Sequence, residues 1–190
     1  MVAGAVHVIN FAGVLNQATG DGLRNICLQA LHQDAREIRL NLATEGGSCF
    51  HAFALYGFLR ALPVPLVTHN IGNIESMGLI VYLAGHKRLV SPHSRFLIRA
   101  LALKGPAGAD LDLPTLRVQH DSLDDDLERL AKIFDQQTQG GRECLDIRQY
   151  LAGPEKRLAG PAAVTCGVAQ GIEEATLPRD AIRWWVDVPQ

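Results

Sequence analysis

The sequence lacks long apolar runs, basic clusters and closely spaced cysteines, and each absence excludes a class of protein. No segment approaches the ~18 uninterrupted apolar residues of a membrane-spanning helix, so we expect no membrane segment. Lys and Arg number 18 against 20 Asp and Glu, without a basic run, which argues against nucleic acid as the main partner. The opening residues lack the basic and apolar regions of a secretory signal.

The cysteines are few and far apart along the chain. They are Cys27, Cys49, Cys144 and Cys166. None forms the C-x-x-C spacing of metal sites and redox motifs, so buried thiols in a reducing compartment fit better than a disulfide framework. We therefore expect no disulfide, no metal and no cofactor, and a cytoplasmic location.

What the chain does contain is an alternation of strand and helix patterns. Strand patterns cover 6–12, 37–43, 64–68, 89–90 and 96–103, and helical patterns cover 19–31, 50–61 and 76–84. Such alternation predicts a largely parallel sheet covered by helices. At 190 residues the chain is long enough for one sizeable core.

The second half of the chain is more helical. A Gly-rich connector at 104–108 precedes the longest amphipathic pattern, 116–134, whose acidic side we interpret as a solvated face rather than a docking surface. Shorter helices are predicted at 143–151 and 161–166, with a loop between them. The adjacent Trp184 and Trp185 are expected to pack on the domain or on a neighbouring subunit.

Ser76 stands where a strand pattern ends and a buried helix pattern begins. Its hydroxyl could cap the helix, since serine is a good N-cap, and spacing alone favours that interpretation. Alternatively, free backbone N–H groups at this point would stabilise negative charge developing on a nucleophile. Because Gly46 and Gly47 also follow a strand, the carboxyl edge of a parallel sheet would bring them near Ser76, which favours a functional site.

These residues carry a resemblance. Gly46 and Gly47, followed 29 residues later by the block Ser76-Met77-Gly78, resemble the ClpP family of serine peptidases. Further similar blocks lie at 83–85, 91–95 and 160–167, so the resemblance covers roughly residues 6–172. It implies an α/β fold of the ClpP/crotonase type, a spiral of β-α units with a long protruding handle helix. Residues 1–190 would form a single ClpP-like domain, with the head at about 1–103 and 140–190 and the handle region at about 104–139.

The resemblance also assigns roles to residues of the site. It implies that Ser76 is the nucleophile and that the backbone N–H groups of Gly47 and Met77 form the oxyanion hole, in which each donor is typically worth ~3 kcal/mol. Gly46, with Gly105 and Gly108 of the connector, would bind an extended peptide by strand addition.

The rest of the triad departs from the family pattern. Arg99 takes the place of the histidine and Glu155 that of the aspartate, while Glu75 replaces the family's alanine before the serine. An arginine cannot accept a proton at any useful pH. In a Ser-His-Asp enzyme, loss of the histidine costs about 10⁶ in turnover. We therefore predict impaired peptide hydrolysis, made worse by a carboxylate at Glu75 that opposes the oxyanion.

Two other histidines could in principle replace the missing base. His69 ends the strand pattern that leads toward Ser76, and His93 lies in the loop that enters the strand of Arg99. A rise of about 3.3 Å per residue places His93, six residues before Arg99, far from the family's histidine position unless the loop folds back, and we expect neither histidine to serve as the base. We instead predict an ion pair between Arg99 and Glu155 in the place of the His-Asp pair.

Three functions remain open at this stage. The chain could be an active ClpP-like serine endopeptidase with a rearranged base, a non-catalytic ring subunit or peptide-binding scaffold, or a crotonase-like acyl-thioester enzyme. The resemblance implies a homo-oligomer of stacked rings that binds peptide or unfolded polypeptide. Family members receive substrate from an ATP-driven unfoldase through an N-terminal loop; here the first strand begins a few residues after Met1, which argues against that partner.

Overall fold

The computed structural model describes residues 4–102 and 112–186 and contains a mixed sheet of eight strands. The strands are β1 (Val6–Ala12), β2 (Glu37–Thr44), β3 (Leu66–Glu75), β4 (Lys87–Val90), β5 (Arg95–Ile98), β6 (Lys156–Ala159), β7 (Gly171–Ile172) and β8 (Ile182–Trp185). The helices are α1 (Gln17–His32), α2 (Cys49–Arg60), α3 (Gly78–Leu83), α4 (Leu113–Thr138), α5 (Arg148–Leu151) and α6 (Gly160–Thr165).

The sheet is largely parallel, as the alternation of patterns predicts. Its main order is β6-β5-β3-β2-β1-β8, and β4 pairs with β3 and β7 beside this path. Every described pairing is parallel except that of β5 with β6. Parallel neighbours need a crossover connection, and the helices α1 and α2 supply it between β1, β2 and β3.

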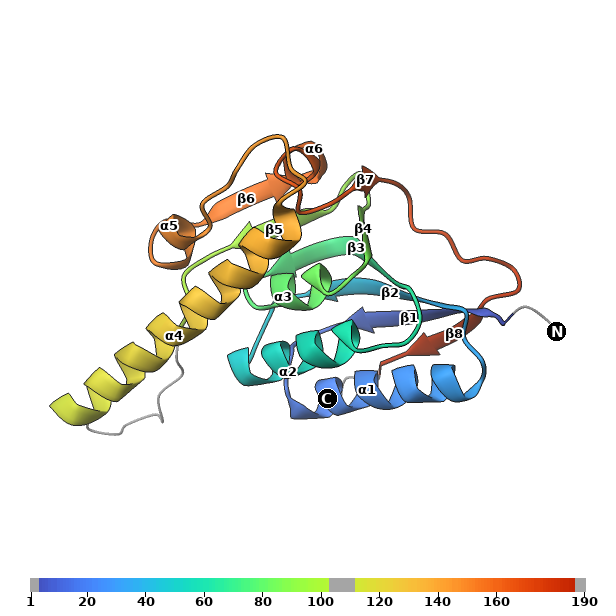
Figure 1. The fold of residues 1–190 in the computed structure, drawn as a ribbon, viewed down its shortest axis with the longest axis horizontal. Coiled ribbons are helices and arrows are strands. Elements are labelled where there is room, and N and C mark those ends of the chain that lie inside the picture. Colours follow the sequence, from blue (N-terminus) through green and yellow to red (C-terminus); the bar gives the residue numbers. More distant parts are fainter. Residues whose placement is uncertain (1–3, 103–111, 187–190) are drawn as a thin grey trace.

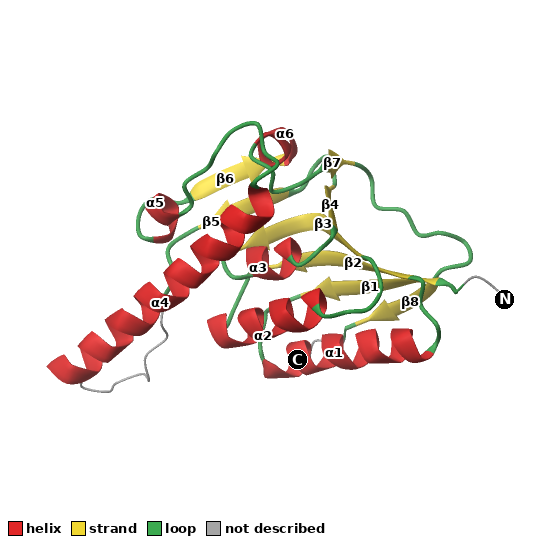
Figure 2. Ribbon diagram, viewed as in Figure 1, coloured by secondary structure: helices red, strands yellow, loops and turns green. Residues whose placement is uncertain are grey.

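One face of the sheet is covered by helices, and this is where the core lies. Figure 1 shows α1, α2 and α3 on one side of the parallel strands β1, β2 and β3, and Figure 2 shows the same three helices in red beside the yellow strands. On the helical side, Ile9, Phe11, Leu40 and Leu42 are at most 1% exposed. Their alternate neighbours on β2 point to the opposite face and are polar, so period-2 patterning defines both faces.

The long helix α4 projects from this body, as the resemblance implies (Figure 1). Only its C-terminal part is anchored, through Leu130, Ala131 and Phe134, which are all buried. The buried guanidinium of Arg88 strengthens this anchor by donating a hydrogen bond of 2.7 Å to the carbonyl oxygen of Gln137. The N-terminal part of α4 makes few such contacts and stays exposed. No helix of the described residues is long and apolar enough to cross a bilayer.

The predicted end of the third strand at residue 68 is wrong. β3 continues to Glu75 but changes neighbour, since Val67–Asn70 pairs with β4 and Asn73–Glu75 pairs with β5. The buried Asn70 side chain stabilises this change by accepting a hydrogen bond from Gly72 N and donating one to the Arg95 carbonyl. Asn70 and Gly72 therefore mark a bend and not an end, which residue preferences alone do not distinguish.

Four other elements differ from expectation. β6 and β8 lie where a loop and a terminal packing segment were predicted, because short edge strands leave little alternation to detect. α5 spans only Arg148–Leu151 instead of 143–151, and β5 ends at Ile98 rather than 103. Trp184 packs against the core and donates a hydrogen bond to buried His7, whereas Trp185 is 68% exposed. The connector glycines Gly105 and Gly108 lie outside the described residues.

The cysteines are free, but they are not all buried. Cys27 and Cys166 are buried, Cys49 is partly buried and Cys144 is exposed. Burial raises the pKa of the Cys27 thiol to about 12. Burial, with a contribution from Asp126, raises that of Cys49 to about 11. Burial also raises the pKa of Cys166.

The reactivity of the four thiols should follow their exposure. We expect Ellman's reagent at pH 8 to label one thiol rapidly in the native protein and four after unfolding, because Cys144 is exposed whereas Cys27 and Cys166 are buried and Cys49 is partly buried with a raised pKa. Cys144→Ser should remove the rapid phase. Rapid labelling of a thiol in native Cys144→Ser would contradict the protection of the other three.

Candidate functional site

Ser76 joins the end of β3 to the start of α3 in a strained conformation. Its φ is +47°, a left-handed value that non-glycine residues seldom adopt. The N-cap of α3 is Met77, and no side-chain hydrogen bond caps the helix. The capping interpretation of Ser76 is therefore wrong. Among the described residues the Ser76 hydroxyl has no hydrogen-bond partner, while its backbone N–H donates to the Leu97 carbonyl at 2.9 Å. Strain of this kind, held by neighbouring strands, is frequent at functional positions.

The Gly46–Gly47 loop packs directly on the backbone around Ser76. A Cβ added to Gly46 would lie 2.7 Å from the Glu75 carbonyl oxygen and 3.2 Å from Met77 N. A Cβ on Gly47 would collide with the carbonyl of Leu15. Both glycines have positive φ, at +86° and +147°. Only glycine allows this approach in this backbone conformation.

A third segment, the loop after β1, holds the glycine loop in place. Leu15 N donates to the Gly46 carbonyl at 2.7 Å, and Ser48 N donates to the Leu15 carbonyl at 3.0 Å. The Leu15 side chain itself is buried. The N–H groups of Gly47 and Met77 have no acceptor among the described residues. One free donor therefore lies on the glycine loop and the other on the turn after β3, which Gly46 contacts.

Arg99 follows β5 and reaches this same contact. Its Nη2 atom lies 3.8 Å from Glu75 Oε2 and 3.5 Å from the carbonyl oxygen of Glu45. The Arg99 side chain is 49% exposed and that of Glu75 only 16%. The carboxylate before Ser76, which alone would oppose negative charge at the site, thus has a guanidinium beside it.

The predicted ion pair between Arg99 and Glu155 does not form. Glu155 pairs instead with Arg157, two residues along its own segment. The strand register brings the two backbones together, since Ile98 pairs with Lys156 and the next positions are Arg99 and Glu155. The prediction failed because the side chain of Arg99 turns to the carboxylate of Glu75, at the end of β3. The replacement of the family's alanine by Glu75 was considered separately from Arg99.

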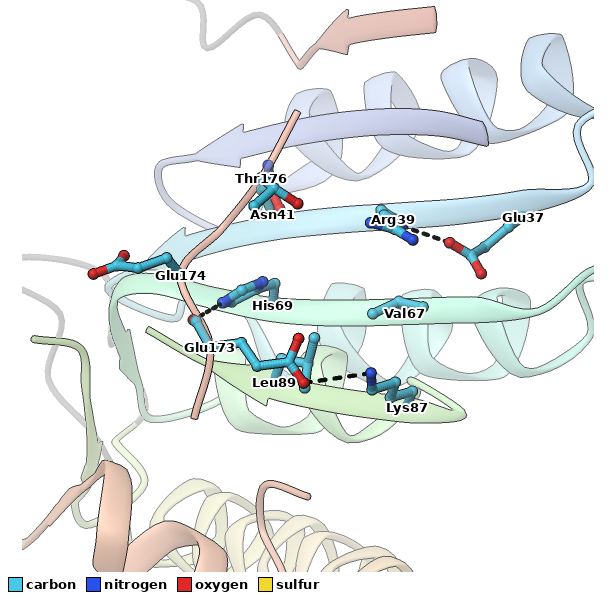
Figure 3. Close-up of a pocket in the computed structure, with 10 residues that line it drawn as sticks. All are labelled: Glu37, Arg39, Asn41, Val67, His69, Lys87, Leu89, Glu173, Glu174 and Thr176. Carbon is cyan, nitrogen blue, oxygen red and sulfur yellow. Dashed lines mark hydrogen bonds and ion pairs between the residues drawn. The ribbon is translucent and has the colours of Figure 1, made fainter. Parts of the chain in front are cut away.

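Among the described residues, neither His69 nor His93 has a hydrogen bond to Ser76. His93 is exposed and lies in the turn before β5, four residues before Leu97, whose carbonyl accepts the hydrogen bond from Ser76 N. His69 lies seven residues before Ser76, and its Nε2 atom is 3.0 Å from the Glu173 carbonyl and 3.1 Å from Ser91 Oγ. Figure 3 shows this ring directed toward the segment at Glu173, on the helix-free face of the sheet.

His69 belongs to a separate, charged pocket on that face. The pocket has a volume of about 130 Å³, and charged side chains of β2, β4 and the segment after β7 line it (Figure 3). Lys87 pairs with Glu173 at 3.5 Å, and Arg39 pairs with Glu37. In the part of the chain that the structure describes, no group of three or more His, Cys, Asp or Glu side chains could hold a metal ion.

The fold and this strand-to-helix turn define the chain as a ClpP-type α/β protein, and comparison with known proteins agrees. The solved structure of a ClpP1 point mutant from Listeria monocytogenes superposes with a TM-score of 0.72, covering 89% of this chain and 92% of that one, at 18% identity. The sequence model of the Clp protease family matches residues 12–175. The chain therefore belongs to the Clp protease family.

Curated relatives are distant in sequence. The chain is 30% identical over 128 residues to the ATP-dependent Clp protease proteolytic subunit of Deinococcus radiodurans. The matched region covers 65% of this chain and 61% of that subunit. It is 24% identical to proteolytic subunit 1 of Chlamydia pneumoniae, over 84% of this chain and 82% of that protein. The chain thus spans less than two thirds of the first of these relatives.

Sequence reasoning missed two contacts within the site. The contact of Leu15 with Gly47 joins segments far apart in sequence, and no local pattern at Leu15 announces it. The pairing of Arg99 with Glu75 did have a signal, because both positions depart from the family pattern with opposite charges. Two such departures in one site favour direct contact.

The burial of His69 makes stability depend on pH. Burial lowers the pKa of His69 despite opposing effects of Glu173 and Glu174. Below pH ~6.5 the unfolded chain therefore binds a proton that the folded chain resists, so folding weakens as pH falls. Above this pH both states are neutral at this residue, and it contributes no pH dependence.

We expect His69→Gln to reveal this dependence in urea unfolding between pH 8 and pH 5. The difference in unfolding free energy between the native sequence and the variant should be constant above pH ~7. Below pH ~6.5 the native sequence should lose stability relative to the variant by up to about 1.4 kcal/mol per pH unit. A difference that stays level down to pH 5 would contradict the buried, neutral histidine.

Proposed function

We propose that this Clp protease family member is a serine peptidase homologue that forms an oligomeric ring, binds extended polypeptide at Ser76, and hydrolyses it poorly. In this proposal Ser76 is the nucleophile position and the N–H groups of Gly47 and Met77 form the oxyanion hole. Arg99 and Glu155 occupy the histidine and aspartate positions. We place the protein in the cytoplasm.

The arrangement of donors supports the nucleophile position. The Ser76 hydroxyl and the N–H groups of Gly47 and Met77 have no acceptor among the described residues. The glycine loop rests on the Glu75–Met77 backbone within van der Waals distance. Donors that are free and held in position by neighbouring strands need no reorganisation when an oxyanion forms.

The observation that carries the proposal of impaired hydrolysis is the position of Arg99. Its guanidinium lies beside the residue that precedes Ser76 and is half exposed. A guanidinium stays protonated and has no acceptor atom, so it cannot take the hydroxyl proton that a serine must lose on attack. The binding features of the site therefore remain while the general base is missing.

The exposed apolar surface of α4 supports assembly through this helix. Leu113 and Leu116 are 61% and 46% exposed and lie three residues apart, on one face of the part of α4 that projects from the body. A second copy of the same helix would cover them. The relatives' names describe subunits of ATP-dependent proteases. We extend to this chain only assembly and polypeptide binding.

Hydrolysis of a short fluorogenic peptide tests the site. We expect little turnover by the native sequence and a gain of about 10²-fold or more in Arg99→His, because a general base is worth 10²–10⁴. Arg99→His with Glu75→Ala should gain further, since Arg99→His leaves the Glu75 carboxylate unpaired beside the oxyanion.

The controls decide what any activity means. Ser76→Ala should abolish the gain in both backgrounds, and Arg95→His, which adds a histidine four residues earlier at the start of β5, should gain nothing. Turnover by the native sequence that Ser76→Ala abolishes would reveal an unrecognised base. Silence of every variant would refute the view of a peptidase site lacking only its base.

Assembly is tested by sedimentation velocity. The native chain should sediment as an oligomer, and Leu113→Asp with Leu116→Asp should shift it toward the monomer by placing charge in the covered face. Ser122→Asp is the matched control, because it adds the same charge at an exposed polar position of α4. A monomeric native chain would remove assembly from the proposal.

A further inference from the structure

Arg99 has more hydrogen-bonding capacity than its present contacts use. A guanidinium carries five N–H donors, and charge-assisted hydrogen bonds to carboxylates normally measure about 2.7–2.9 Å. The contacts of Arg99 with Glu75 and with the Glu45 carbonyl are 3.8 and 3.5 Å. A half-exposed guanidinium with only long contacts can still bind an anionic ligand.

Three further donors lie around the same point. Gly46 follows Glu45, whose carbonyl Arg99 reaches, and a Cβ on Gly46 would lie 3.1 Å from Ser76 Cβ and 3.2 Å from Met77 N. The Ser76 hydroxyl and the N–H groups of Gly47 and Met77 have no acceptor among the described residues. One positive charge and three neutral donors therefore lie on neighbouring residues where the glycine loop meets the turn after β3.

We infer that this site is a carboxylate receptor that holds the free C-terminus of a bound peptide. One carboxylate oxygen occupies the hole between Gly47 N and Met77 N, and the other faces Arg99 and the Ser76 hydroxyl. The inference rests on the proposed polypeptide binding at Ser76 and adds the ligand class. Where a peptidase needs a base that activates serine, this chain has a cation that holds a carboxylate.

The acidic neighbours are consistent with a monoanion. Glu75 and Glu45 flank Arg99, and a dianionic phosphate would meet greater repulsion from them than a carboxylate with one charge. One arginine can serve two carboxylates at once in this fold, since Arg148 contacts Glu128 at 3.2 Å and Asp135 at 3.0 Å. Arg99 can likewise keep Glu75 as a neighbour while it binds the ligand.

A pair of peptide pools that differ in one group tests the inference. The probes are random heptapeptides with a free C-terminal carboxylate and the same pool ending in an amide, incubated with the full-length oligomer and quantified by mass spectrometry after equilibrium dialysis. We expect the acid pool to be retained about tenfold or more over the amide pool, because hydrogen bonds to charged groups are the strong ones. The preference should weaken as salt is raised.

Arg99→Gln should abolish the preference, so that the acid pool is retained no better than the amide pool. Arg99→Lys keeps the charge without the planar fork, so it should retain a reduced preference. Arg24→Gln, which removes a paired arginine on α1, is the control and should behave like the native sequence. Thermal unfolding of each variant checks that it is folded.

Each outcome separates this inference from the proposed function. Equal retention of the two pools by the native sequence, or an acid preference that survives Arg99→Gln, would overturn the carboxylate receptor. Retention of neither pool would overturn it as well. In all three cases, the gain of hydrolysis in Arg99→His with Glu75→Ala would decide the proposed function independently.

Discussion

The approach of three backbone segments at Gly46 and Gly47 is the constraint on which the site depends. The loop after β1, the loop after β2 and the turn after β3 meet there without intervening side chains, because a Cβ on either glycine would overlap backbone atoms. The hydrogen bonds of Leu15 hold the first two loops together, and the bond from Ser76 N to the Leu97 carbonyl holds the third against β5. Parallel strands end at the same edge, so the sheet itself brings these loops together.

Two residues of the site, Glu75 and Arg99, depart from the family pattern with opposite charges. A glutamate before the serine would alone disfavour an oxyanion, and an arginine in place of the histidine would alone leave an excess cation. Side by side they offset one another. Under the proposed function, the two changes leave the donors of the site without a general base and favour binding over turnover, which unites the proposed function with the carboxylate receptor.

The bend in β3 connects this site with the opposite end of the sheet. Before the bend, β3 pairs with β4 and carries His69 into the charged pocket; after it, β3 pairs with β5 and delivers Ser76 to the glycine loop. Asn70 stabilises the change from fully buried surroundings. The two regions consequently lie on one strand but face different partners, and His69 cannot serve Ser76.

The sequence by itself determined the alternation of strands and helices, the parallel sheet, the long projecting helix and the identity of the serine and glycine turns. Those features follow from local periodicity and from the spacing of short blocks. Tertiary structure alone decided that β3 bends instead of ending, that β6 and β8 complete the edges, and that Arg99 turns to Glu75 and not to Glu155. The reason is physical: side-chain direction and strand partners depend on groups distant in sequence, whose positions no local pattern contains.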